Sequence, residues 1–473
     1  MTDELISMTA REAVRRLRAR EITPLDLVDA AAARIEAVDG AVNALPTLCL
    51  DRARDMAKAF QAPAEPGPGW LAGLPIVVKD LEELAGVRTT FGSPIFADYV
   101  PDVNEISVET LQRNGAIPIA KSNTPEFGAG ANTFNEVFGK TRNPWNTAMT
   151  CGGSSGGSAV ALATGMAWLG TGSDLGGSLR TPSSFCSTVG LRPSPGRVAT
   201  GPGRNPFQTL SVHGPMGRTV GDVALMLDAE CGHHPRDPLS LARPATPFQK
   251  AADAPRAPGR IGFSANLGLG PVDPEVVDIC RAAAYRFADD GTIVEEACPD
   301  FSGALETFQT LRAELYVGVN AALLRNHRDL LKPEVIWNIE KGMRLTAADI
   351  GAAEETRGQI FQRVVRWFED YDLLACPAAI VPPFDVDIRY VEGVGDHRFD
   401  NYVDWLYIVS AVTLTSCPAI SVPAGFTSSG LPVGVQLMAR PRGEAELLSF
   451  AAHLEGTLAL RSEMPILPRA GTP

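Results

Sequence analysis

The sequence has few of the residue patterns that hold metals or disulfides. Its eight cysteines are scattered without a Cys-x-x-Cys pair, and of its six histidines only His233 and His234 are neighbours. A chain of 473 residues does not need disulfides for stability, so we expect reduced and mostly buried thiols. Without a His-Glu-x-x-His or Cys/His cluster, the histidine pair is interpreted as a surface loop rather than a zinc site. We therefore expect no metal and no cofactor.

The chain also lacks a long apolar run, a basic leader and an excess of positive charge. The longest nearly apolar segment, residues 159–170, is shorter than the ~20 residues that span a bilayer, and residues 1–5 do not begin a secretory signal. Acidic residues outnumber basic ones 55 to 42, for a formal charge of -13. Nucleic-acid binding needs a basic surface, which this composition does not indicate. We predict a cytoplasmic protein without a transmembrane helix and without nucleic-acid or membrane partners.

What is present is an ordinary globular composition with alternating strand and helix patterns. The sequence is 45% hydrophobic and 21% charged, and it has no visible internal repeat. Thr9 and Thr23 begin two predicted helices, the second with proline at its first position. A segment from Asp273 to Trp367 has a helical pattern. The β-type runs are residues 76–78, 117–120, 419–422 and 433–438. This alternation predicts an α/β fold.

The segment from Cys151 to Ser158 is rich in glycine and serine and leads directly into an apolar run. Glycines in so apolar a context indicate a tight turn or a close approach of two backbone segments. A flexible loop is one alternative, and a phosphate cradle at a helix N-terminus is another. A phosphate loop would end in Gly-Lys-Ser/Thr, which is absent. Taken alone, the segment leaves the structural and catalytic interpretations open.

A second segment, Gly172 to Arg180, points to a nucleophile. Two glycines directly before Ser178 leave backbone N–H groups free to converge on one point, as an oxyanion hole requires. Asp174 and Arg180 are expected to form an ion pair that holds this loop. A serine hydroxyl needs a base, but neither segment contains histidine and the usual Gly-x-Ser-x-Gly elbow is missing.

Lys79, at the end of a β-type run, is a candidate for that base. Burial disfavours the charged ammonium and can leave a neutral amine near pH 7. A lysine that follows a strand is more often a solvated strand end, and position alone does not separate the two roles.

Three segments together resemble the amidase signature family: Val78-Lys79-Asp80, Gly152 to Ser158 and Gly176 to Arg180. The likeness continues through residues 141–146, 185–186, 189–193, 214–216 and 430–436. It covers roughly residues 5–460 and implies a single domain with a central mixed β-sheet surrounded by helices. The expected parts are N-terminal helices at about 5–60, a catalytic core at about 61–235 and 370–460, and an inserted helical layer at about 270–368.

The resemblance also implies the site. In that family a lysine, a serine held by a cis peptide bond and a nucleophilic serine form the triad, and these roles match Lys79, Ser154 and Ser178. A cis bond between Gly153 and Ser154 is implied, and Ser155 resembles a supporting hydrogen-bonding residue. The oxyanion hole is implied to consist of the backbone N–H groups of Leu175, Gly176, Gly177 and Ser178.

The activity implied is hydrolysis of small, uncharged, apolar or aryl amides through an acyl-enzyme on Ser178, with esterase and possible carbamate activity. Such an enzyme needs its substrate and water, and acts as a monomer or homodimer. By analogy the pocket walls are expected to include Gly128, Ala129, Thr150, Cys151 and Arg204. The loop 201–211 is either a mobile lid or a surface turn.

Two departures from the family's commonest pattern stand near the site. Leu81 occupies a place where asparagine is frequent, and Cys151 one where small residues or proline are frequent. Neither touches the triad chemistry. Cys151 is either a reactive thiol or, as we favour, a small pocket-wall residue.

A second function within the same resemblance is the glutamine-hydrolysing subunit of a tRNA-dependent amidotransferase, which works in a complex. Against it, Thr181 stands where such subunits commonly have glutamine, and residues 200–206 depart from their usual pattern. A non-catalytic scaffold is disfavoured because all three triad positions are filled.

Overall fold

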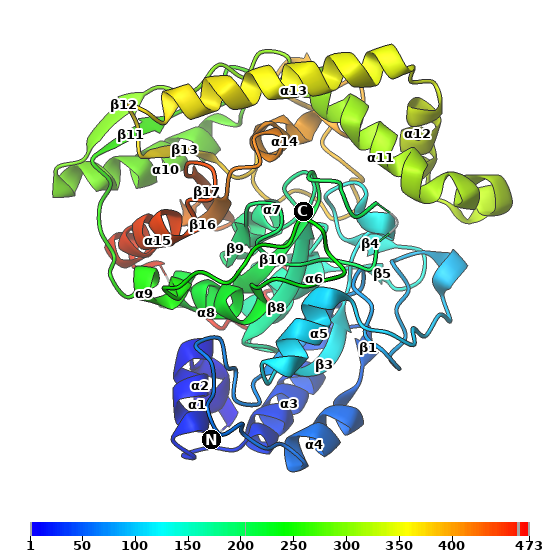
Figure 1. Ribbon diagram of the computed structural model, residues 1–473, viewed down its shortest axis with the longest axis vertical. Helices are drawn as coiled ribbons and strands as arrows, with labels where there is room; N and C mark the ends of the chain where they lie inside the picture. The colour runs from blue at the N-terminus through cyan, green and yellow to red at the C-terminus, as the bar shows by residue number, and fades with distance from the viewer. Residues whose placement is uncertain (1, 204, 461–463, 472–473) are drawn as a thin grey trace.

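The computed structural model describes residues 2–203, 205–460 and 464–471. Within these residues, one mixed sheet of eleven strands forms the centre and helices surround it (Figure 1). In spatial order the strands are β1 (Thr47–Leu48), β3 (Ile117–Ser122), β2 (Pro75–Lys79), β8 (Leu169–Asp174), β10 (Val212–Gly217), β9 (Val189–Arg192), β16 (Ala419–Phe426), β17 (Pro432–Met438), β13 (Leu373–Pro377), β11 (Arg260–Phe263) and β12 (Ile293–Glu296). The predicted α/β fold with a central mixed sheet is confirmed.

The helices cover both ends of this sheet. In Figure 1, α1 (Thr2–Ser7), α2 (Ala10–Arg18), α3 (Pro24–Val42) and α4 (Leu50–Lys58) lie at the bottom of the view, and α11 (Ala304–His327), α12 (Pro333–Met343) and α13 (Ala347–Trp367) lie at the top. The other α-helices are α5 (Ile106–Arg113), α6 (Gly156–Ala163), α7 (Arg180–Cys186), α8 (Val220–Glu230), α9 (Phe248–Ala252), α10 (Pro274–Tyr285), α14 (Tyr407–Leu414) and α15 (Glu444–Leu458).

Short elements complete the chain. Three two-stranded sheets pair β4 (Phe134–Asn135) with β5 (Gly139–Lys140), β6 (Arg142–Asn143) with β7 (Asn146–Thr150), and β14 (Gly393–Val394) with β15 (His397–Arg398). The 3-10 turns are η1 (Pro94–Phe96), η2 (Glu126–Gly128), η3 (Arg286–Asp290), η4 (Arg328–Leu330) and η5 (Asp404–Leu406). None of the helices in the described part of the chain is both long and apolar enough to cross a membrane.

Both helices predicted near the N-terminus are present, and each begins after its predicted cap. The Thr23 side chain and Asp26 form the two reciprocal hydrogen bonds of a capping box before α3. The Thr9 side chain accepts from the Glu12 N–H at 3.1 Å, whereas the Glu12 carboxylate binds Arg15 instead of reaching back. A threonine cap therefore marks the start of each helix, but only α3 has both hydrogen bonds of the capping box.

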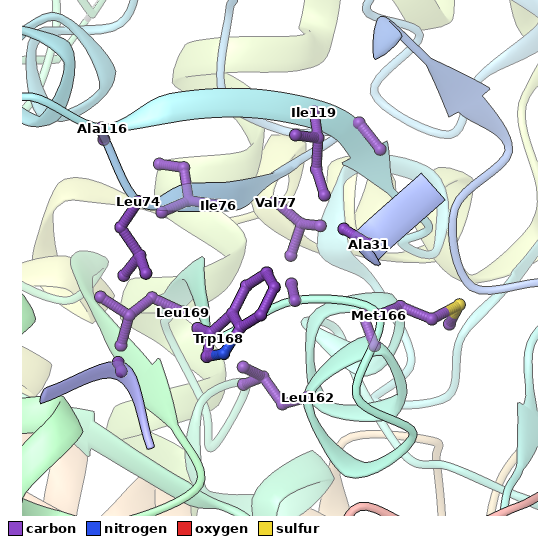
Figure 2. Close-up of a cluster of buried hydrophobic side chains, with 14 of the residues drawn as sticks. Ala31, Leu74, Ile76, Val77, Ala116, Ile119, Leu162, Met166, Trp168 and Leu169 are labelled. Carbon is purple, nitrogen blue, oxygen red and sulfur yellow. The ribbon is translucent and has the colours of Figure 1, made fainter. Parts of the chain in front are cut away.

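The apolar run at residues 159–170 is core, as its composition indicates. It forms α6 and the start of β8, and its residues are buried throughout. Figure 2 shows Trp168 packed among side chains of β2 and α6, and its indole N–H donates to the Leu5 carbonyl at 3.3 Å. Burying each such large apolar side chain contributes about 1.5–3 kcal/mol, so this cluster anchors β2 firmly.

The middle of the chain is not purely helical. Residues 293–296 form β12, which lies at the sheet edge and pairs parallel with β11, and β11 in turn pairs parallel with β13. The helical layer expected at about 270–368 is thus interrupted by a strand that extends the sheet. The sequence did not predict β12 because it is only four residues long and Ile293 is 56% exposed, so no buried alternation marks it.

The order of strands in the sheet brings distant segments to one edge. β2 lies between β3 and β8 and runs parallel to both. Parallel neighbours end at the same edge of a sheet, so Lys79 at the end of β2 and Asp174 at the end of β8 emerge together. The loop after β8 therefore begins beside the end of the lysine strand.

Candidate active site

Lys79 is fully buried, and hydroxyl groups surround its amine. Its Nζ atom lies 2.8 Å from Ser154 Oγ and 2.9 Å from Ser155 Oγ. A third hydroxyl oxygen, Ser173 Oγ, lies 3.0 Å away. The Lys79 backbone N–H donates to Thr171 Oγ1 at 2.9 Å, which fixes the end of β2 against β8. The lysine is thus held at a polar point inside the core and is not a solvated strand end.

This environment favours the neutral amine. Burial lowers the pKa of Lys79 from 10.5 to about 7, although the charges of Glu82 and Asp174 oppose part of the shift. Glu82 is buried as well, and burial raises its pKa to about 7. Burial therefore shifts Lys79 toward the unprotonated amine, whose lone pair can accept a proton.

Ser154 lies in the turn before α6, and the peptide bond between Gly153 and Ser154 is cis. All residues from 151 to 158 are buried, which excludes a flexible linker. A Cβ atom at Gly157 would lie 2.3 Å from the backbone nitrogen of Asn123, so this position admits no side chain. Gly152, with a φ of +70°, adopts the left-handed backbone of a tight turn. The glycines of this segment thus serve both purposes that the sequence indicates.

Ser178 lies in the loop between β8 and α7 and is 8% exposed. Its carbonyl oxygen accepts from the Ser155 N–H at 3.2 Å, which joins the two Gly/Ser segments. The hydroxyls of Ser154 and Ser178 line the same pocket. Within the described part of the chain no hydrogen bond links these two hydroxyls, a common state of catalytic pairs before substrate binds.

The loop after β8 presents three of the four N–H groups expected for an oxyanion hole. The N–H groups of Leu175, Gly176 and Ser178 have no hydrogen-bond partner among the described residues. The fourth, from Gly177, donates to Asp174 Oδ1 at 2.9 Å and so is directed away from this set. In this structure the Gly177 N–H therefore supports the loop, because the Asp174 carboxylate lies within its reach.

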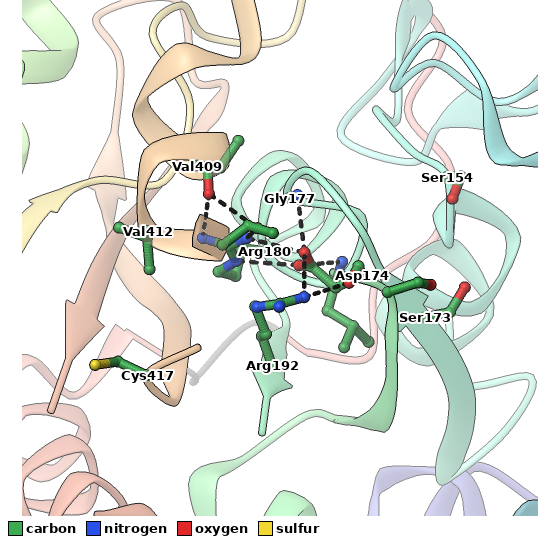
Figure 3. Close-up of polar contacts among 12 residues, drawn as sticks. Ser154, Ser173, Asp174, Gly177, Arg180, Arg192, Val409, Val412 and Cys417 are labelled. Carbon is green, nitrogen blue, oxygen red and sulfur yellow. Dashed lines mark hydrogen bonds and ion pairs between the residues drawn. The ribbon is translucent and has the colours of Figure 1, made fainter. Parts of the chain in front are cut away.

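The ion pair expected between Asp174 and Arg180 is present and fully buried. Arg180 Nη2 lies 2.9 Å from Asp174 Oδ1, and Arg180 Nε donates to Oδ2 at 3.0 Å. Figure 3 shows Arg192 on the other side of the carboxylate, 3.4 Å from Oδ1. Burial alone would raise the pKa of Asp174, but the two guanidinium groups hold it well below its usual range. Arg180 also donates to the Val409 carbonyl at 3.0 Å, so this cluster fixes the Ser178 loop to α14.

The serine hydroxyls open onto a cavity of about 340 Å³. Its lining residues are Leu81, Phe127, Gly128, Ser154, Ser173, Leu175, Ser178, Gly203, Asn205, Gln208, Ser211, His213, Leu315, Tyr316, Val319 and Asn320. None of these described residues is an aspartate, glutamate, lysine or arginine. Burial, together with nearby Lys79, lowers the pKa of His213 to about 3, so its ring is neutral. A larger cleft of about 990 Å³ lies between α2 and α15, and its lining does not include Lys79, Ser154, Ser173 or Ser178.

The structure places the expected pocket-wall residues differently. Gly128 lines the cavity, whereas Ala129, Thr150 and Cys151 are buried outside its lining. Burial raises the pKa of the Cys151 thiol to about 12, which disfavours a reactive thiolate there. Arg204 lies outside the described residues. The loop 201–211 contributes Gly203, Asn205, Gln208 and Ser211 to the cavity wall.

Two hydroxyl residues near the lysine were not predicted from the sequence. Thr171 and Ser173 lie on the same face of β8, and this i, i+2 spacing of hydroxyl residues was the available signal. Arg192 and Glu82 were also missed, because their contacts depend on how strands and turns far apart in sequence come together. In the part of the chain that the structure describes, no group of three or more His, Cys, Asp or Glu side chains is arranged to hold a metal.

Comparison with known proteins identifies the family. Residues 26–448 match the family described as Amidase. The chain is 33% identical to an acylamidase from Rhodococcus erythropolis, over 97% of each chain. It is 35% identical to a glutamyl-tRNA(Gln) amidotransferase subunit from Moorella thermoacetica, over 98% of this chain and 99% of that one. A solved bacterial aryl acylamidase of the amidase signature family superimposes with a TM-score of 0.89 at 26% identity, covering 99% of both chains. The chain therefore belongs to the amidase signature family, whose enzymes hydrolyse carbon–nitrogen bonds other than peptide bonds.

Proposed function

We propose that this enzyme hydrolyses small, uncharged, apolar or aryl amides through an acyl-enzyme on Ser178. The observation that carries the proposal is a buried Lys79–Ser154 contact of 2.8 Å beside a cavity of about 340 Å³ without a charged side chain among its described lining residues. A cavity of this size suits a small molecule rather than a polypeptide. The similarity to an acylamidase supports the same class of substrate.

The proposed proton path runs from Ser178 to Lys79. Neutral Lys79 accepts the proton of the Ser154 hydroxyl, and Ser154 Oγ accepts the proton of Ser178 as Ser178 Oγ bonds to the carbonyl carbon. The path then reverses, the leaving nitrogen takes the proton as the C–N bond breaks, and the acyl-enzyme remains. Water, deprotonated along the same path, releases the acid and restores the Ser178 hydroxyl.

The N–H groups of Leu175, Gly176 and Ser178 stabilise the oxyanion in this scheme. Preorganised donors of this kind are worth about 2.7–4 kcal/mol each when one is removed. Because the site recognises an acyl carbonyl, ester cleavage and carbamate cleavage follow as further activities. Esters need less help from the proton path, since their leaving group departs more readily than an amine.

Glutamine hydrolysis as part of an amidotransferase is the second candidate, and the 35% identity to one chain of such a complex favours it. Glutamine carries an ammonium and a carboxylate, and both lose water when they enter a pocket. Without counter-charges that desolvation is expensive. Among the described lining residues none is charged, and this favours neutral amides over glutamine. We also propose that the enzyme acts without a partner chain or nucleic acid, as a cytoplasmic monomer or homodimer.

The test is hydrolysis by the purified protein of an aryl amide, an aryl ester, an aryl carbamate and glutamine, with Ser178→Ala and Lys79→Ala as matched variants. We expect turnover of the aryl substrates, and loss of amide cleavage in both variants. Turnover of glutamine alone, or activity only after a partner is supplied, would support the amidotransferase function instead.

A further inference from the structure

The side-chain amide of Asn320 lies at the cavity wall and has no hydrogen-bond partner among the residues that the structure describes. It lies on α11, is 6% exposed and lines the cavity that contains Ser154 and Ser178. Its side chain makes no hydrogen bond to any residue that the structure describes. A carboxamide has two donors and one acceptor, and buried amides are nearly always paired.

Two other polar groups of the cavity wall are paired within the protein. Both ends of the Gln208 amide bind the backbone of Ser211, at 2.9 and 2.8 Å. The Tyr316 hydroxyl donates to the Phe127 carbonyl at 3.2 Å. Among the described lining residues, Asn320 is therefore the buried amide without a partner. The Asn205 amide also makes no hydrogen bond to a described residue, but it is only half-buried.

The surroundings of Asn320 are apolar. Leu315 and Val319, on the same helix, line the cavity too, and Phe127 faces it from η2. Tyr316 stands one helical turn before Asn320, so the two share a face of α11. An apolar wall with a single unpaired amide can bind a mainly apolar group that carries one polar atom in a fixed place. A purely apolar group there would leave the amide without the water or partner it needs.

We propose that Asn320 determines specificity by hydrogen-bonding an uncharged polar group of the substrate, such as a carbonyl or hydroxyl, away from the scissile bond. This inference rests on the proposed hydrolysis of small neutral amides. A neutral carboxamide does not offset a desolvated charge, so the recognised group is itself neutral. Preferred substrates then carry a second hydrogen-bonding group beside the amide that is cleaved.

The experiment compares two pairs of anilides matched in size. One pair varies the acyl side, pentanoyl against 4-oxopentanoyl, and the other varies the leaving side, 3-ethylanilide against 3-acetylanilide. For each pair, kcat/KM of the polar member is divided by that of the apolar member. Intrinsic reactivity cancels when this ratio is compared between the natural protein and Asn320→Leu or Asn320→Ala. Asn326→Ala, which removes an exposed amide on the same helix outside the cavity lining, is the control.

We expect the ratio of at least one pair to fall about tenfold in both Asn320 variants and to stay unchanged in Asn326→Ala. Asn320→Ala keeps the test informative if Asn320→Leu fails to fold. Equal ratios in all variants, with amides still hydrolysed, would overturn the role of Asn320 and leave the proposed function intact. No turnover of any anilide by the natural protein would overturn both.

Discussion

The Nζ atom of Lys79 lies 2.8 Å from the hydroxyl oxygen of Ser154, although the two residues are 75 positions apart. One ends a buried strand, and the other stands in a cis turn before a buried helix. The Lys79 amine is fully buried, whereas the Ser154 hydroxyl borders the cavity as well. This contact therefore connects the buried base to the cavity, and it sets the first step of the proposed proton path.

The pH dependence of amide hydrolysis should report the protonation of Lys79. A base acts in its unprotonated form, and burial brings the pKa of Lys79 down to about 7. We expect kcat/KM for an uncharged amide to rise about tenfold per pH unit below that value and to level off above it. The measurement is a profile from pH 5 to 9 with a substrate that does not titrate. A flat profile over this range, or a rate that still rises tenfold per unit at pH 9, would contradict a Lys79 base with a lowered pKa.

Removing the Glu82 carboxyl should shift that profile. Near pH 7 the ionised form of Glu82 raises the pKa of Lys79, so Glu82→Gln should lower that pKa and move the upper part of the acidic limb toward lower pH. Glu83→Gln is the matched control, because Glu83 is half-buried and its carboxylate accepts from Tyr99 at 2.7 Å. An identical pH profile for both variants would show that the Glu82 charge does not affect the pKa of Lys79.

Arg180→Met should destabilise the protein. It leaves the buried Asp174 carboxylate with Arg192 as its remaining guanidinium, at 3.4 Å. Removing one member of a buried ion pair typically costs about 3 kcal/mol or more. Urea unfolding should show a clearly lower midpoint, whereas Arg15→Met, at an exposed pair, should leave the midpoint nearly unchanged. Equal midpoints for the two variants would contradict a structural role for this cluster.

Gly128→Ala should lower activity more than stability. The new Cβ atom would lie 3.3 Å from Ser154 Oγ and 3.1 Å from Leu81 Cδ1, and Gly128 has a φ of +72°. The left-handed backbone costs about 1–2 kcal/mol with a side chain, and crowding of Ser154 should reduce kcat roughly tenfold or more. Gly318→Ala, with open space around its Cβ position on α11, should retain full activity. Similar kcat values for Gly128→Ala and Gly318→Ala would show that a Cβ atom beside Ser154 does not impair catalysis.

Much of this site was predictable because its residues lie in short segments with a marked local pattern. Lys79, Ser154 and Ser178 were named from the sequence. In the structure the two serines line one cavity, and Lys79 contacts Ser154 from the buried side. The helix caps at Thr9 and Thr23 were equally local signals, and they mark the helix starts.

What the sequence could not predict depends on tertiary contacts. β12 is too short and too exposed to show a strand pattern. The Gly177 N–H was assigned to the oxyanion hole because the sequence does not show that it bends back to Asp174. Asn320 resembles any polar residue of a long helix until the fold places it, buried and unpaired, in the cavity.

The central claim is that Ser178 forms the acyl-enzyme, and covalent labelling tests it most directly. The protein is incubated with an activated aryl carbamate, whose carbamoyl-enzyme hydrolyses slowly, and the modified peptide is located by mass spectrometry. We predict one carbamoyl group on Ser178, formed slowly in Lys79→Ala and absent in Ser178→Ala. A label on Ser154, on Ser155 or on a cysteine, or rapid turnover by Ser178→Ala, would contradict the account.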